Sequence, residues 1–154
     1  MKAIHSIYVA LAICSAFFSG FISAEEMETT MSDKSVAITL TVDSTVITAT
    51  LDNSQTSSEF LATLPRTMSM TRYGDREYYG KVGKAISEEG QKIDDFSNGD
   101  VTYYAAGRSF AIFYAKEGES SQSGLIRMGK ITSDLRDFEK LSGAVEMRIE
   151  VGER

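Results

Sequence analysis

The chain has 154 residues with one cysteine, one histidine and no tryptophan, and its 16 basic and 22 acidic side chains give a formal net charge of −6. This length suits one domain with a single core and is too short for two ordinary domains. The acidic balance argues against nucleic acid or an anionic membrane as a partner, because both attract basic proteins.

Residues 1–24 have the three-part layout of a secretory signal peptide. Lys2 supplies a positive charge, an apolar run covers residues 7–22, and Ala24 is a small residue directly before the acidic Glu25. The run is short and interrupted compared with the roughly 20 apolar residues of a membrane-spanning helix. We therefore predict a signal peptide over 1–24, a secreted or periplasmic protein, and no stable membrane span once the signal is removed.

Both the only cysteine, Cys14, and the only histidine, His5, lie within this predicted signal peptide. The bulky Ile13 before Cys14 makes a lipoprotein processing site the lesser alternative. Without these two residues the mature chain has no disulfide, no thiolate or imidazole metal ligand, and no histidine-dependent nucleophile. We therefore predict no metal site and no cofactor, and we assign no catalytic residue.

The remaining chain is predicted to consist of a flexible polar lead over 25–35 and one domain over 36–154. Alternation of apolar and polar residues predicts β-strands. The predicted strands are 36–42, 45–51, 67–73, one that starts at Glu77, 101–105, 110–114, 125–131 and 144–151.

Two short helices are predicted between these strands. Residues 54–65 have the capping-box spacing of Thr56 and Glu59 and end at Pro65, and residues 133–143 have Ser133 as N-cap. The polar stretch 87–100, with its carboxylate pairs, is predicted to be a solvated loop. Such an order of elements favours a mainly β fold, a closed antiparallel β-barrel of about eight strands whose two short helices plug the mouths.

Five short motifs resemble the bacterial cyclophilin-like domains in type and in order. They are Leu64-Pro65, Glu77-Tyr78, Gly99-Asp100, Phe113-Tyr114 and Gly129. The resemblance covers about residues 36–151 and implies a cyclophilin-type barrel. It does not carry over activity, because the arginine, phenylalanine-methionine, histidine and tryptophan features of prolyl isomerases are missing. Isomerisation needs mainly an apolar socket and a donor, so it stays an alternative.

Aromatic residues are concentrated in residues 99–115, and one face of these strands is expected to fill the barrel. Tyrosines, adaptable methionines and an arginine that can bind a carboxylate or carbonyl together suit a binding groove. The predicted ligand-binding residues are Arg66, Met68, Met70, Tyr79, Tyr104 and Tyr114. The alternative is that both methionines fill the barrel and the arginine is a surface charge.

The function predicted from these observations is an exported cyclophilin-like barrel that binds a small ligand or an extended peptide in a groove. Two alternatives stay open, a peptidyl-prolyl isomerase and a structural component of an envelope complex. We lean against an enzyme, because no residue set here indicates a reaction.

Export yields the first testable prediction. Cleavage after Ala24 should leave a mature chain that begins at Glu25, and intact-mass spectrometry of exported protein checks this. An intact Met1 on exported material, or a lipid on Cys14, would contradict the prediction.

Overall fold

The computed structural model describes residues 34–153. The predicted signal peptide and most of the predicted lead lie outside these residues. The elements are β1 (Val36–Val42), β2 (Thr45–Leu51), α1 (Gln55–Leu61), β3 (Arg66–Tyr73), β4 (Glu77–Lys81), β5 (Gln91–Ile93), β6 (Asp100–Tyr104), the 3-10 turn η1 (Ala105–Gly107), β7 (Ser109–Phe113), β8 (Leu125–Ile131), the 3-10 helix η2 (Leu135–Lys140) and β9 (Val145–Val151).

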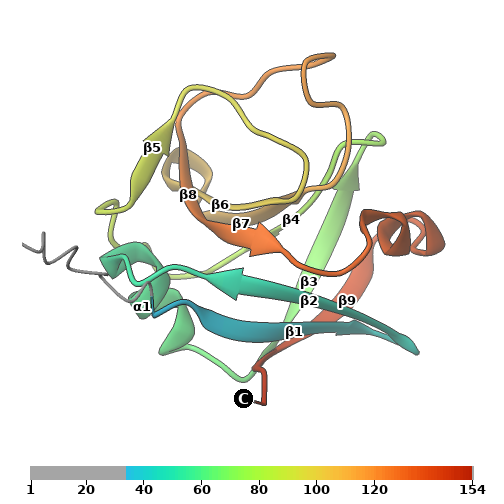
Figure 1. Cartoon of the computed structure of the whole chain (residues 1–154), viewed down its shortest axis with the longest axis horizontal. Helices are drawn as coiled ribbons and strands as arrows, with labels where there is room; N and C mark the ends of the chain where they lie inside the picture. Colours follow the sequence, from blue (N-terminus) through green and yellow to red (C-terminus); the bar gives the residue numbers. More distant parts are fainter. Residues whose placement is uncertain (1–33, 154) are drawn as a thin grey trace, which may run out of the picture. The chain divides into compact units, whose positions relative to one another are not determined.

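Eight of the strands form a closed antiparallel barrel, which confirms the predicted fold class (Figure 1). The strand order is β2-β1-β9-β3-β4-β7-β6-β8, and pairing of β2 with β8 closes the ring. The ninth strand, β5, pairs only with β8. Closure leaves the eight barrel strands without a free edge. The exposed edge of the sheet belongs to β5, which pairs with β8 on one side only. Among the described residues, no helix is long and apolar enough to span a bilayer.

Helix α1 covers one mouth of the barrel. Its N-cap is Ser54, whose side chain accepts from the backbone N–H of Ser57 at 3.2 Å, so the cap lies two residues before the predicted Thr56. The ring of Phe60 is fully buried and stacks on Phe110 with 4.5 Å between ring centroids. The helix therefore fills the barrel end with an aromatic side chain, as predicted.

The predicted second helix is the 3-10 helix η2, which lies at the other end of β1 and β2 from α1 (Figure 1). Its N-cap is Asp134 and not the predicted Ser133. Phe138 is fully buried and stacks on Tyr114 with 5.2 Å between centroids. This second ring fills the other mouth.

Strands β6 and β7 are buried on both faces, so their aromatic residues belong to two clusters. Tyr103 and Phe110 point into the barrel and join the main core. Phe113 and Ala111 lie on the outer face, in a smaller cluster with Phe96. The aromatic stretch therefore fills the barrel with one face and covers its outside with the other.

The outer cluster corrects the loop predicted for residues 87–100. Part of this stretch is β5, and Phe96 is buried and stacks on Phe113 with 4.2 Å between centroids. Ile93 and Phe96 stand singly among polar residues and make no strand or helix period. The sequence pattern therefore gave no indication that residues 87–100 include a segment that covers the outside of the barrel.

Barrel closure depends on a glycine in β8. A Cβ built on Gly129 would lie 1.9 Å from the carbonyl oxygen of Thr50 in β2. No side chain fits at that separation, so the two strands can pair here only because residue 129 has none.

Replacing this glycine should open the barrel. We expect Gly129→Ala to lower the free energy of unfolding by about 3 kcal/mol or more, since backbone atoms must move to admit the methyl group. Chemical denaturation measures the loss. A Gly152→Ala protein, whose Cβ would lie 3.3 Å from its nearest neighbour, is the matched control. A loss below about 1 kcal/mol for Gly129→Ala would contradict the clash.

Candidate functional site

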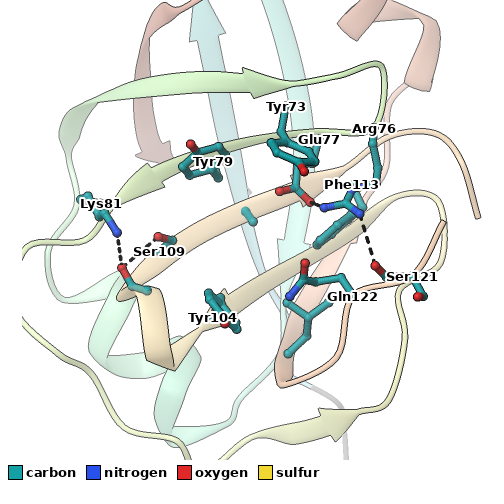
Figure 2. A pocket seen from close by; sticks show the side chains of 13 residues that line it. Tyr73, Arg76, Glu77, Tyr79, Lys81, Tyr104, Ser109, Phe113, Ser121 and Gln122 are labelled. Carbon is teal, nitrogen blue, oxygen red and sulfur yellow. Dashed lines mark hydrogen bonds and ion pairs between the residues drawn. The ribbon is translucent and has the colours of Figure 1, made fainter.

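A hollow of about 410 Å³ lies on the outer face of β4, β7 and β6 (Figure 2). Four aromatic side chains and a small number of polar groups surround it. Its lining residues are Tyr73, Arg76, Glu77, Tyr79, Lys81, Tyr104, Gly107, Ser109, Ala111, Phe113, Ser121, Gln122 and Leu125.

Strand alternation places three of the lining residues on one face of β4. Glu77, Tyr79 and Lys81 are two residues apart, and side chains at this spacing share a face. Their β7 partners Phe113, Ala111 and Ser109 form the next row of the sheet. Because the side chains of Ala111 and Ser109 are small, they leave space above β7 and form the floor of the hollow. The larger ring of Tyr79 forms the wall on the β4 side.

The wall on the β6 side is Tyr104, the last residue of its strand. A Cβ on Gly107 would lie 2.8 Å from the Tyr104 ring, so the glycine of η1 lets the turn fold against the tyrosine. Arg108 then adopts a left-handed conformation with φ of 46° and leads into β7. The Ala-Gly-Arg turn between the two aromatic runs thus fixes the position of Tyr104.

Arg76 and Glu77 form an ion pair at one end of the hollow. An Arg76 nitrogen lies 3.1 Å from Glu77 Oε2, and the guanidinium lies over the rings of Tyr73 at 4.9 Å and Phe113 at 5.5 Å. It also donates to the carbonyl oxygen of Ser121 at 3.3 Å. Arg76 therefore binds the loop before β8 to the outer face of the sheet.

Burial raises the pKa of the Glu77 carboxyl above its ordinary value, and the positive charge of Arg76 opposes this rise. The raised pKa means that Glu77 holds its proton more tightly in the folded chain than in the unfolded one. This group therefore stabilises the fold as pH falls through its folded pKa, and that contribution is lost as pH rises.

Lys81 lies at the end of the hollow away from Arg76 (Figure 2). Its ammonium donates to the carbonyl oxygen of Gly107 at 2.6 Å. Within residues 34–153 no carboxylate forms an ion pair with Lys81, whereas Arg76 is paired with Glu77. The charged side chains of the hollow therefore leave one positive charge uncompensated.

The structure places the six predicted ligand-binding residues in different surroundings. Tyr79 and Tyr104 both line the hollow. Tyr114 lies at a second hollow, of about 480 Å³, beside Arg72 and η2. Its hydroxyl is buried with no hydrogen-bond partner in the described part of the chain, and burial raises its pKa while the charge of Arg72 opposes the rise.

The other three predicted residues lie away from the outer face. Met68 and Met70 are buried in the barrel core, where they pack over Gly80. Arg66 donates from both terminal nitrogens to the carbonyl oxygen of Val82, each at 3.2 Å. These contacts match the alternative in which the methionines fill the barrel, and they give Arg66 a structural contact.

Sequence reasoning missed Arg76, Glu77 and Lys81 as lining residues. One signal was present, since Glu77, Tyr79 and Lys81 share a face of a predicted strand and combine charged groups with a ring.

Over residues 34–153, no three side chains of the His, Cys, Asp and Glu types gather as a metal-binding group would require.

Comparison with known proteins agrees with the fold. A sequence profile of a family described as the cyclophilin-like family matches residues 40–150. The solution structure of a hypothetical protein from Archaeoglobus fulgidus is similar, with a TM-score of 0.62 and 20% sequence identity over 77% of this chain and 95% of that one. At this identity the likeness concerns the fold alone. No curated protein matches the chain in sequence.

The environment of Glu77 gives a titration that can be measured. We expect its carboxyl, followed by carbon-detected NMR, to titrate with a midpoint above the ordinary value of 4.5. In an Arg76→Met protein the midpoint should rise further, because the attraction that favours the carboxylate is gone. A midpoint at or below 4.5 in the unchanged protein, or a fall in the variant, would contradict this description of the site.

Proposed function

Since this chain belongs to the cyclophilin-like family, we propose that it is an exported binding protein whose small ligand occupies the hollow over β4, β7 and β6. The observation that carries the proposal is the cavity itself. It is about 410 Å³ in volume, with aromatic walls and a floor of small residues.

The size and lining of the hollow support a small ligand. Binding sites for small molecules have volumes of roughly 300 to 1,000 Å³ and combine aromatic walls with a few placed polar groups. Here the walls include Tyr79 and Tyr104, and the polar groups include Glu77, Lys81 and the amide of Gln122. An extended peptide is the alternative ligand, and it would lie along β4 and occupy the same hollow with one of its side chains.

Export rests on the layout of residues 1–24 alone. If the protein is secreted or periplasmic, its ligand is one that is present outside the cytoplasm. A structural role in an envelope complex would also fit export, but the ring-walled cavity favours binding of a small molecule.

Isomerisation of prolyl peptides is the second candidate, because the hollow offers the apolar ring of Phe113 beside the cation Arg76. Such a reaction needs a donor near the prolyl nitrogen and no nucleophile. Turnover of a proline-containing test peptide, compared between the unchanged protein and Arg76→Met, separates an enzyme from a binding protein. Loss of turnover in the variant would favour the isomerase.

The binding proposal predicts the effect of removing one wall. Hydrocinnamyl alcohol, a neutral probe with a ring, should shift amide NMR signals of residues around the hollow. We expect Tyr104→Ala to weaken its binding about tenfold, or about 1.4 kcal/mol, since an aromatic wall is lost. Val46→Ala, which truncates an exposed side chain on β2, should not change the affinity.

Two of the four other predicted residues, Arg66 and Tyr114, serve as the counter-test. If Arg66→Ala or Tyr114→Phe weakens binding while Tyr104→Ala does not, and all variants remain folded by circular dichroism, the ligand binds away from this hollow. Substitution of Met68 or Met70 is less useful, because both side chains are buried in the core.

A further inference from the structure

We propose that the ligand of the hollow is a small amphipathic acid, with its carboxylate on Lys81 and its apolar body between Tyr79 and Tyr104. The inference rests on the proposed function and adds the chemical class of the ligand. Three observations support it: the uncompensated charge, the donors at one end and the floor of small residues.

Charge is the first observation. Of the two cations that line the hollow, Arg76 is already paired with Glu77 at 3.1 Å and lies over aromatic rings. Among the described residues, Lys81 has no carboxylate partner. The end of the hollow at Lys81 is thus positively charged, although the chain as a whole has a net charge of −6. An anionic group on the ligand would compensate this positive charge, whereas an amine would be repelled by Lys81.

Hydrogen-bond donors are the second observation. A lysine ammonium has three N–H donors, and only the one to Gly107 is used among residues 34–153. Lys81 is exposed at one end of the hollow, Tyr79 lies between it and Glu77 along β4, and Tyr104 lies across from Tyr79 (Figure 2). The hydroxyls of these tyrosines make no hydrogen bond with any described residue. A carboxylate on the Lys81 ammonium would therefore accept from donors that the described part of the chain leaves free.

The floor of the hollow is the third observation. Ala111 and Ser109 are small, and beyond them Phe113 and Leu125 present apolar surface. The Ser109 hydroxyl donates to the carbonyl of Gly107 at 3.0 Å, so it does not need the ligand. A ring or a short aliphatic body over this floor would bury apolar area without depriving the Ser109 hydroxyl of its partner.

Three probes with the same phenylpropyl body test the class. They are hydrocinnamate, hydrocinnamyl alcohol and phenylpropylamine, each titrated by NMR into the protein at neutral pH and low ionic strength. We expect the acid to bind about threefold more tightly than the alcohol, as one partly exposed ion pair allows, and the amine to bind most weakly. In Lys81→Met the ratio of acid to alcohol affinity should fall to about one.

Lys84→Met is the matched control, since it removes an exposed lysine that does not line the hollow. The acid-to-alcohol ratio should remain about threefold there. If the amine binds as tightly as the acid, or if Lys84→Met lowers the ratio as much as Lys81→Met does, the inference is wrong while a site in the hollow still stands. If none of the probes shifts signals of the lining residues, the proposed function fails with it.

Discussion

The bend of β8 is the constraint on which the barrel depends. This strand pairs with β6 along most of its length and must then turn to meet β2. A bulge makes the turn, because Val101 pairs with Gly129 while Thr102 pairs with Arg127, which leaves Met128 as the extra residue. The carbonyl of Met128 accepts the backbone N–H of Asp52 at 2.7 Å and the hydroxyl of Ser57 at 3.2 Å. The same bulge that closes the barrel therefore also anchors the start of α1.

Charges next to this bulge hold β6 and β8 together. Asp100 is fully buried at the start of β6, and its carboxylate pairs with Arg127 at 2.9 Å and Lys130 at 2.8 Å. It also accepts from the backbone N–H of Ser97 at 2.7 Å, while Gly99 takes up a φ of 90° before it. A buried carboxylate without such partners would be strongly destabilising. The Gly-Asp motif is thus explained by a turn and a buried charge, and it needs no role in binding.

Much of the fold could be predicted from the sequence, because most strands face the core on one side and water on the other. That asymmetry produces alternation, as in β1, β2 and β9, and it made the strand count and the barrel predictable. Strands β6 and β7 were also predicted, although nearly every residue in them is buried. Alternation fails in the segment that covers their outer face, whose apolar residues Ile93 and Phe96 make no strand or helix period.

The same covered face explains why only part of the site was predictable. Tyr79 and Tyr104 could be predicted because a tyrosine combines a ring with a polar group, which suits a binding site. A methionine gives no such indication, because the same residue type fills a barrel core or lines a groove. Glu77 and Lys81 share a strand face with Tyr79 and could have been found from that pattern, whereas Arg76 could not. Arg76 lies before its strand and acts by reaching over rings from β3, β7 and the covering segment, and no local pattern encodes contacts between distant segments. Once Arg76 compensates Glu77, the character of the hollow is set by Lys81, and this follows only from knowing which charges are already paired.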